Sequence, residues 1–539
     1  MKKIILSGFL LVCFAVVQAQ SVEQGIKQIY YGRYQSAANT LKAVVQQNPN
    51  DAEAWYWLTN AYLQQDAVEE ARNHLHKAPV TVNDQPFYKV AYGSLLLNEN
   101  KGDSAALFFE AALKDTKEKN PAILSAVARA HINAKEGNGE YAVDLVQKAI
   151  KKDKKNARLY VLLGNAYRKL NKGSEAFEAY KEALDKDDQL ASAYYRLGKI
   201  FVTQKNADVY LDYFNKAVAA DKKYAPAYYE LYHHYFFHDP AKAMKIYKQY
   251  QSLSDHSIAS DYAYTDLLYL NKNYTEAIQN ANKLMDKEKE NIEPRMYKLL
   301  AYSYAGLKDT TKAISYMQQY FTREADSNFV IKDFETMADL YAAADGMTDS
   351  SYVYYERAAA MEKDPEAAAA YYKKMATLAQ SLKDYPAQAK WLGQYYANSK
   401  NATNVDLFNW GLAQYLSENF TQADSIFGVY VEKYPEQGYG YYWQARSNAA
   451  LDKEMKDGLA VPYYKKLIEV MEKDSTDANY KKWLVEAYAY LAAYATNTQK
   501  DYAEAVDYFE KLLQIDPENS DAKKYISMLE KNLANRESK

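Results

Sequence analysis

The chain has 539 residues, of which 48% are apolar and 25% charged, so it can bury a large hydrophobic core. It contains 55 tyrosines but only 18 glycines and 12 prolines, and this shortage of turn-forming residues argues against a fold of many short strands. The formal net charge of −3 leaves no basic excess for holding nucleic acid, so we expect no nucleic-acid partner.

Residues 1–19 are typical of a secretory signal peptide. Lysines at positions 2 and 3 form the basic end, an apolar stretch follows from Ile4 to Val17, and compact side chains up to Ala19 precede a cleavage site. The mature chain would begin near Gln20, and loss of the two lysines would take its formal charge from −3 to −5. We therefore expect an exported, periplasmic protein.

Cys13, the only cysteine, lies within this apolar stretch. Cleavage after Ala19 would leave the mature chain without a thiol, a disulfide or a thiolate metal site. The alternative is that Cys13 is the lipid-modified first residue of a lipoprotein. Leu10, Leu11 and Val12 disfavour that alternative, because bacterial lipoprotein signals place a small residue before the cysteine. After residue 20 no run approaches the roughly 18 apolar residues of a membrane helix, so we expect no transmembrane segment in the mature chain.

A repeat of 34 residues is clearest in two consecutive copies. The corresponding positions are Tyr160 and Tyr194, Leu163 and Leu197, Gly164 and Gly198, Tyr167 and Phe201, Tyr180 and Phe214, and Ala183 and Ala217. Within each copy, apolar residues recur at helical spacing over two stretches separated by a polar break, which predicts a hairpin of two antiparallel helices. Gly164 and Ala176 would be small because two such helices approach closely only where side chains are minimal, and tyrosines such as Tyr180 would fill the space around them.

Further copies can be followed along nearly the whole mature chain, about 14 in all. Clear markers are Trp55, Leu58 and Tyr62; Gly93 and Phe109; Leu124, Val127 and Ala128; Tyr228, Leu231 and Tyr247; Tyr297, Leu300 and Tyr304; Phe334, Met337 and Tyr341; Gly411 and Phe427; and Trp483 and Phe509. Polar stretches at 252–256, 286–293, 398–404 and 473–479 are candidate bends. We expect an N-terminal array over 20–250, a more divergent C-terminal array over 251–520, and a capping helix and tail over 521–539.

The pattern resembles the tetratricopeptide repeat (TPR), a helix–turn–helix unit that carries a large residue, Leu-Gly, an aromatic, Ala, a second aromatic and a closing Pro. The closing proline is present at Pro49, Pro435 and Pro517, where it cannot continue the second helix. Asp188 and Lys222 replace it in two other copies. The resemblance implies an all-α fold, a right-handed α-solenoid of stacked helical hairpins, with a concave surface that binds proteins or extended peptides.

In TPR proteins the first helix of each hairpin lines the concave surface, so residues one and five positions after each repeat tyrosine would face the groove. With Arg168 added, this rule selects as partner-binding candidates Tyr56, Asn60, Val161, Asn165, Arg168, Tyr195, Lys199, Tyr229, His233, Tyr262, Asp266, Lys298 and Tyr302. Asn60 and Asn165 match a position where peptide-binding TPR proteins often carry asparagine, whose amide can donate to and accept from a peptide backbone. A clamp for a terminal carboxylate needs several basic residues on successive repeats, and the residues near that arrangement are Asn165, Arg168, Arg196 and Lys199.

Motifs for catalysis are absent from the sequence after residue 20, which has no Gly-rich phosphate loop, no Gly-x-Ser-x-Gly turn and no cysteine nucleophile. His234 and His238 would share a helix face, but no third metal ligand is visible. We therefore expect a non-enzymatic protein–protein interaction scaffold of the cell envelope, without cofactor or metal. The alternative is a glycan-binding or outer-membrane assembly protein resembling the SusD family, which contains TPR units and aromatic sugar platforms. That family is normally lipidated and interrupts its repeats with long insertions.

Overall fold

The computed structural model describes residues 20–473 and 476–537, and every regular element in those ranges is a helix. The predicted all-α solenoid of helical hairpins is confirmed. The predicted signal peptide over 1–19, with Cys13, lies outside the described residues. Internal contacts divide the chain into two compact units, unit 1 (residues 1–292) and unit 2 (residues 293–539). Within the described ranges no helix is both long and apolar enough to cross a bilayer.

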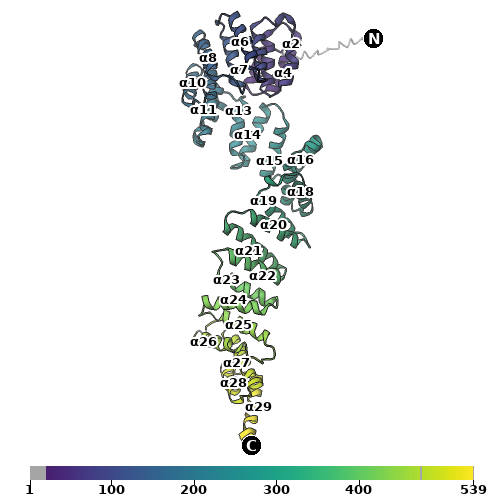
Figure 1. Cartoon of the computed structure of the whole chain (residues 1–539), viewed down its shortest axis with the longest axis vertical. Helices are drawn as coiled ribbons and strands as arrows, with labels where there is room; N and C mark the ends of the chain where they lie inside the picture. The colour runs from purple at the N-terminus through teal and green to yellow at the C-terminus, as the bar shows by residue number, and fades with distance from the viewer. Residues whose placement is uncertain (1–19, 474–475, 538–539) are drawn as a thin grey trace, which may run out of the picture. The chain divides into compact units, whose positions relative to one another are not determined.

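Unit 1 consists of antiparallel hairpins joined by short turns (Figure 1). Its helices are α1 (Val22–Tyr30), α2 (Tyr34–Gln47), α3 (Ala52–Leu63), α4 (Val68–Leu75), η1 (Val80–Val82), α5 (Pro86–Asn98), α6 (Gly102–Asp115), α7 (Pro121–Asn133), α8 (Gly139–Lys152), α9 (Ala157–Lys169), α10 (Gly173–Lys186), α11 (Ala191–Thr203), α12 (Ala207–Ala220), α13 (Ala225–Tyr235), α14 (Pro240–Leu253), α15 (Ile258–Leu270), α16 (Tyr274–Glu288) and η2 (Lys289–Asn291). The first helices of successive hairpins also contact one another, α3 with α5, α5 with α7 and α7 with α9. They therefore form a continuous inner layer.

Unit 2 repeats the same hairpins in chain order (Figure 1). Its helices are α17 (Arg295–Gly306), α18 (Thr310–Arg323), η3 (Asp326–Asn328), α19 (Ile331–Ala342), α20 (Thr348–Met361), α21 (Pro365–Ser381), α22 (Tyr385–Asn398), α23 (Asn404–Leu416), α24 (Phe420–Lys433), α25 (Gly438–Leu451), α26 (Val461–Met471), α27 (Tyr480–Tyr494), η4 (Ala495–Gln499), α28 (Tyr502–Ile515) and α29 (Ser520–Glu537). The division between the units falls within the polar stretch 286–293. The boundary expected at 250–251 separates more regular repeats from more divergent ones, and it stays a prediction.

Glycines of the first helix face large side chains of the second helix within a hairpin. A Cβ atom on Gly164 would lie 2.3 Å from Cε1 of Tyr180, and one on Gly198 would lie 2.5 Å from Cε1 of Phe214. Both aromatic side chains are fully buried. The predicted close approach of the two helices, with a ring packed on a residue that has no side chain, is confirmed.

The turns inside several hairpins pass through left-handed backbone at residues other than glycine. The φ angles are 55° at Lys205, 62° at Lys308 and 61° at Glu418. A residue with a Cβ atom adopts this conformation at a cost of roughly 1 kcal/mol relative to glycine. The protein therefore forms tight turns despite its low glycine content, and accepts local strain at each of them.

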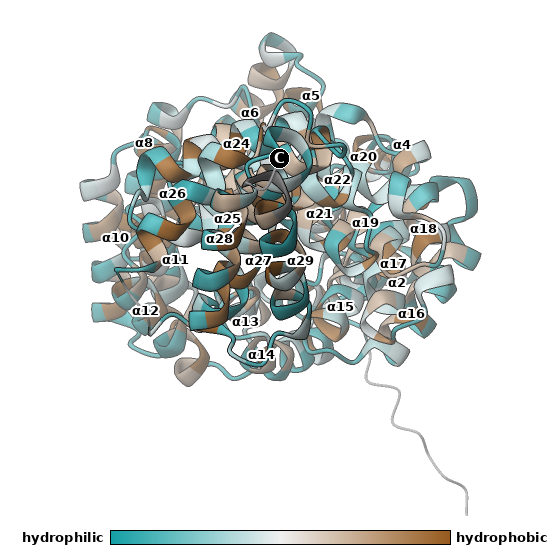
Figure 2. Ribbon diagram, turned by 90° about the horizontal axis from the view of Figure 1, so that it is seen from below, coloured by the Kyte–Doolittle hydropathy of each residue, from teal (hydrophilic) through white to brown (hydrophobic). Residues whose placement is uncertain are grey.

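The hydrophobic core follows the solenoid instead of forming a single centre. One cluster of buried apolar side chains extends from Ala37 to Ala179 in unit 1, and another from Tyr441 to Leu529 in unit 2. Figure 2 shows the helices carrying brown apolar residues among teal hydrophilic ones, whereas the turns between them are mainly teal. Each hairpin is thus stabilised by burial against its neighbours.

The first hairpin of unit 1 also contacts helices that lie far from it in sequence. The Tyr30 hydroxyl accepts a hydrogen bond from the backbone N–H of Ser192, with N and O 3.3 Å apart. The ring centroid of Tyr30 lies 5.1 Å from that of Tyr224. Unit 1 therefore curves far enough for its beginning to meet α11 and the start of α13.

The N-terminus of α2 is capped by Asp255, which follows α14. One carboxylate oxygen of Asp255 accepts hydrogen bonds from the backbone N–H groups of Gln35 and Ser36, at 2.8 and 3.1 Å. Arg33, at the N-cap position itself, makes no side-chain cap and lies 3.6 Å from the same carboxylate. We call this contact region, residues 30–36 against Ser192, Tyr224 and Asp255, the seam.

Candidate functional site

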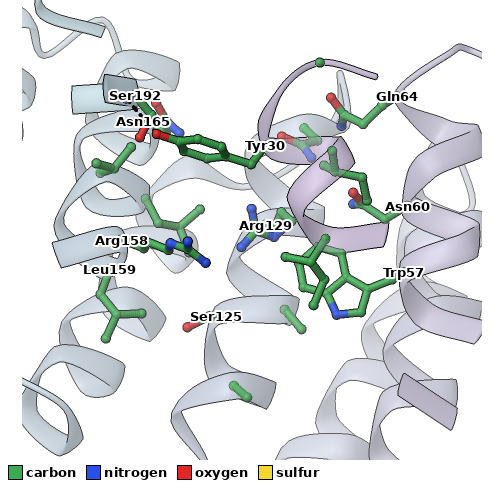
Figure 3. Close-up of a pocket in the computed structure, with 18 of the residues that line it drawn as sticks. Tyr30, Trp57, Asn60, Gln64, Ser125, Arg129, Arg158, Leu159, Asn165 and Ser192 are labelled. Carbon is green, nitrogen blue, oxygen red and sulfur yellow. Dashed lines mark hydrogen bonds between the residues drawn. The ribbon is translucent and has the colours of Figure 1, made fainter. Parts of the chain in front are cut away.

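The seam borders a pocket of about 460 Å³ inside unit 1. The inner faces of α1, α3, α7, α9 and α11 form most of its wall, and α2, α5 and α13 contribute one residue each. Figure 3 shows side chains from these helices projecting into the same space, with Tyr30 above and Ser125 below. A volume of this size is within the range of about 300–1,000 Å³ that is common for ligand sites.

The lining residues occupy one register on successive inner helices. On α3 and α7 they follow the spacing i, i+3, i+4, i+7 and i+11, and on α9 and α11 they follow the first part of that spacing, which places them on one face. They are Glu53, Tyr56, Trp57 and Asn60 on α3, with Gln64 directly after it; Ala122, Ser125, Ala126, Arg129 and Asn133 on α7; Arg158, Val161, Leu162 and Asn165 on α9, with Leu159 beside this register; and Ser192, Tyr195 and Arg196 on α11. The repeat therefore presents the same face of each inner helix to the pocket.

The charge of the lining is positive, although the whole chain carries a formal −3. Arg129, Arg158 and Arg196 line the pocket together with a single carboxylate, Glu53. Within the part of the chain that the structure describes, none of the three guanidinium groups forms an ion pair with a carboxylate. The pocket therefore has a formal excess of two positive charges.

Two buried polar atoms of the lining lack hydrogen-bond partners within residues 20–473 and 476–537. They are Nε of Arg129 and the hydroxyl oxygen of Tyr56, whose side chain is 2% exposed. Burial raises the pKa of Tyr56, and the charge of the nearby Arg129 offsets part of that rise. Buried polar groups are usually paired, so these two atoms mark a place where a ligand atom would be favourable.

Amide groups add hydrogen-bonding capacity to the wall. The Tyr180 hydroxyl donates to Oδ1 of Asn165 at 2.9 Å, which fixes the orientation of that amide and directs its NH₂ group away from Tyr180. Burial raises the pKa of Tyr180 to about 12, so the phenol stays protonated and keeps donating at physiological pH. Asn165 is thus held with two N–H donors available for the pocket.

Five of the predicted partner-binding residues line this pocket, namely Tyr56, Asn60, Val161, Asn165 and Tyr195. Lys199 and Arg168 do not belong to its lining. Nζ of Lys199 lies 2.8 Å from Oε1 of Glu230, and the Tyr195 hydroxyl donates to the same oxygen at 3.3 Å. The charge of Lys199 is therefore already neutralised by a neighbouring inner helix.

The other predicted residues lie outside the pocket. Tyr229 is 41% exposed and stacks on His233, with ring centroids 6.0 Å apart, and Tyr262 is buried. Asp266, like Tyr262, lies on α15 and is half-buried. A role in binding for any of these residues stays a prediction.

Lys298 and Tyr302 belong to unit 2, where they converge on the buried carboxylate of Asp333. Nζ of Lys298 lies 2.5 Å from Oδ1 of Asp333, and the Tyr302 hydroxyl donates to that oxygen at 2.9 Å. Tyr320 donates to Oδ2 at 3.2 Å, and proximity to this carboxylate adds to the effect of burial in raising the Tyr320 pKa. These contacts stabilise two neighbouring hairpins and use the polar atoms of Lys298 and Tyr302 for packing.

The sequence rule missed residues of the pocket because it was not applied to the repeat that contains α7. In α7 the repeat position is Leu124, and the residues one and five positions later are Ser125 and Arg129, both in the lining. The rule would have selected them if it had been applied at Leu124. Arg158 shares a helix face with Val161 and Asn165, and only the full helical register would have identified it.

The two histidines of α13 and its following turn do not form a metal centre. Nδ1 of His234 is hydrogen-bonded to the Tyr210 hydroxyl at 2.7 Å, and the ring centroids of His234 and His238 are 5.8 Å apart. Among the described residues, no three His, Cys, Asp or Glu side chains gather as metal ligands. His234 therefore packs as part of the hairpin.

Comparison with known families agrees with this architecture. Models described as the tetratricopeptide repeat match residues 29–91, residues 191–224 and 487–519, and residues 407–436, and one described as the TPR repeat matches residues 164–205. No curated protein matches the chain.

Several solved structures resemble parts of the chain. The C-terminal part of a TPR repeat-containing protein from Cytophaga hutchinsonii is 29% identical, with a TM-score of 0.30, and the match covers 49% of this chain and 98% of that one. A tetratricopeptide repeat protein from Parabacteroides merdae is 15% identical, with a TM-score of 0.30 and coverage of 47% and 96%. A thermophilic TPR protein from Thermus thermophilus is 19% identical, with a TM-score of 0.26 and coverage of 38% and 96%. These TM-scores are low, so the assignment rests on the family models and on the hairpins themselves. Because the matches to four repeat models are spread over both units, and each match falls on helical hairpins, the chain is a tetratricopeptide-repeat protein.

Proposed function

We propose that this protein is a non-enzymatic interaction scaffold of the cell envelope, which holds an extended segment of a partner protein in the pocket of unit 1. Tetratricopeptide repeats support a role in protein–protein interaction, because stacked hairpins leave a long curved surface for a partner. The observation that carries the proposal is the lining of the pocket, where aromatic rings, amides and unpaired guanidinium groups face one space.

The chemistry of this lining suits a polypeptide in an extended conformation. Such a segment carries unpaired backbone N–H and C=O groups, which must find partners when they leave water. The NH₂ group of Asn165 and the guanidinium of Arg129 can donate to carbonyl oxygens, and the Tyr56 hydroxyl can donate or accept. The rings of Tyr30 and Trp57 provide apolar surface for side chains.

The experiment that tests the proposal blocks the pocket without disturbing the core. Ala122 lines the pocket, is exposed, and follows Pro121 at the start of α7. Ala241 is exposed, follows Pro240 at the start of α14, and does not belong to the lining. Ala122→Trp should fill the pocket, whereas Ala241→Trp adds the same side chain at an equivalent helix position elsewhere.

A photo-crosslinking amino acid placed at Asn133, an exposed residue of the lining, would report occupancy of the pocket in the native envelope. We expect a defined crosslinked partner in the wild-type background and with Ala241→Trp, and its loss with Ala122→Trp. Equal crosslinking in all three backgrounds would show that the partner does not occupy the pocket.

The envelope location is supported by the signal-like pattern of residues 1–19. Mass spectrometry of the mature N-terminus tests it. A chain that begins at Gln20, free or cyclised, would agree with export and cleavage, whereas an acylated Cys13 would indicate a lipoprotein.

A further inference from the structure

We propose that the pocket of unit 1 recognises the carboxylate side chains of an acidic, extended segment through Arg129, Arg158 and Arg196. This inference rests on the proposed function and names the chemical class of the partner.

The three arginines are held by aromatic rings and not by carboxylates. The guanidinium carbon of Arg129 lies 5.2 Å from the ring centroid of Trp57, that of Arg158 lies 5.7 Å from Tyr30, and that of Arg196 lies 5.6 Å from Tyr195. A guanidinium on an aromatic face keeps the N–H groups of its edge available, and that edge matches a carboxylate with two parallel hydrogen bonds. The rings therefore orient the guanidinium groups and leave the N–H groups at their edges available for hydrogen bonds.

The only carboxylate of the lining is already engaged. Oε1 of Glu53 accepts a hydrogen bond from Nε1 of Trp57 at 3.2 Å, and Glu53 forms no ion pair with an arginine in the part of the chain described. Figure 3 shows Arg129 and Arg158 pointing toward each other in the middle of the pocket, with Trp57 on one side and Leu159 on the other. Two like charges that face each other across a pocket repel, and an anion between them would relieve that repulsion.

The buried, unpaired Nε of Arg129 and the buried, unpaired Tyr56 hydroxyl point to the same conclusion. Both can donate a hydrogen bond, and the Tyr56 hydroxyl lies near Arg129 in the lining. The lining holds three guanidinium groups against one carboxylate, so it favours a ligand that brings further acceptors. Carboxylate oxygens, which only accept hydrogen bonds when ionised, meet that requirement.

The arrangement of the arginines favours an extended acidic segment over a single small anion. Arg129, Arg158 and Arg196 belong to three successive inner helices, α7, α9 and α11, and occupy three different positions of the helix register. Axes of packed helices lie about 8–10 Å apart, so Arg129 and Arg196 cannot be expected to meet on one ion. In an extended chain, side chains two residues apart are separated by roughly 6.5 Å and lie on the same side, which suits acidic residues at alternate positions.

The test uses the mature chain and short synthetic peptides. The probe is a fluorescently labelled peptide of alternating Glu and Ser, acetylated and amidated so that it carries no terminal charges, and binding is followed by fluorescence anisotropy. A Gln–Ser peptide of the same length is the neutral control. We expect the Glu–Ser peptide to bind at least tenfold more tightly than the Gln–Ser peptide, and increased NaCl to weaken the binding.

Single substitutions then locate the interaction. Arg129→Gln and Arg196→Gln should each weaken Glu–Ser binding about tenfold or more, because each removes a charge-assisted hydrogen bond. Lys151→Gln removes the same charge from an exposed position of α8 and should leave binding unchanged. Circular dichroism checks that each variant stays helical. Arg129→Lys keeps the charge but loses the planar fork, so it should recover only part of the affinity.

Three outcomes would overturn the inference. The first is equal binding of the Glu–Ser and Gln–Ser peptides, and the second is no effect of the arginine variants. The third is displacement of the peptide by inorganic phosphate but not by NaCl of equal ionic strength, which would indicate a site for small anions.

The scaffold proposal is tested independently of this inference. If acidic peptides do not bind but Ala122→Trp still abolishes the partner crosslink, only the charge recognition is wrong. If Ala122→Trp leaves the crosslink unchanged, the pocket itself is not the partner site.

Discussion

Asp255→Ala should loosen the first hairpin of unit 1, although Asp255 is 220 residues from Gln35 in the sequence. The substitution removes two charge-assisted hydrogen bonds to backbone N–H groups, at 2.8 and 3.1 Å, and the hydrogen bond from the Ser36 hydroxyl. Loss of a helix N-cap costs about 0.5–2 kcal/mol, and hydrogen bonds to charged groups contribute about 1.5–3 kcal/mol. The side chain of Arg33 is 40% exposed, so its ion pair at 3.6 Å adds little. We expect a total loss of about 2–4 kcal/mol at the seam.

Hydrogen–deuterium exchange with mass spectrometry measures this loss locally. A destabilisation of about 2–4 kcal/mol corresponds to exchange that is roughly 30-fold to several hundred-fold faster, because each 1.4 kcal/mol is a factor of ten. Peptides from the end of α1, from α2 and from the region of Tyr224 should all lose protection, since the seam opens as a unit. Asp309→Ala is the control, because Asp309 caps α18 only locally, through the backbone N–H of Lys312 at 3.2 Å. Faster exchange confined to the first turn of α2, or no change, would refute the reasoning.

Three further predictions concern stability and are measured by denaturant unfolding followed by circular dichroism. Lys205→Gly should stabilise its hairpin by up to about 1 kcal/mol, because glycine adopts a φ of 55° without strain, and a lower midpoint would contradict this. Gly164→Ala should destabilise by about 1–3 kcal/mol, because the new Cβ atom would lie 2.3 Å from the buried Tyr180 ring, and Tyr180→Leu in the same chain should recover part of the loss. Because of His131, the free energy of unfolding should fall as the pH drops from about 6.5 to 4. Burial, and secondarily Lys169, lowers the pKa of His131 in the folded state to about 4. Between these pH values the imidazole is protonated in the unfolded chain but neutral in the folded one, which favours unfolding. His131→Phe should abolish that pH dependence, and an unchanged slope would show that another group causes it.

The repeat architecture was predictable because its determinants are local. Gly164 and Tyr180 belong to one hairpin, and their contact depends only on two helices and the turn between them. A spacing of 34 residues between equivalent side chains is therefore enough to locate the hairpins. The seam was not predictable, because the meeting of Tyr30 with Ser192 depends on small rotations that accumulate over several hairpins.

The pocket was predictable in part for the same reason. Tyr56, Asn60 and Asn165 were found because the TPR resemblance indicated which helices line the groove, and residue spacing then gave the helix face. Whether a side chain on that face is available to a partner depends on its neighbours. Lys199, for example, forms an ion pair with Glu230 of the next inner helix. That pairing depends on the relative height of two helices, which a single sequence does not reveal.

The cap that Asp255 provides has a consequence for the newly made chain. A ribosome that adds roughly 5–20 residues per second needs on the order of 10–45 s to proceed from Gln35 to its partner 220 residues later. During that interval the backbone N–H groups of Gln35 and Ser36 lack the Asp255 carboxylate as an acceptor. Most solenoid contacts join neighbouring repeats, whereas this cap joins residues 220 apart and can form only after Asp255 has been made.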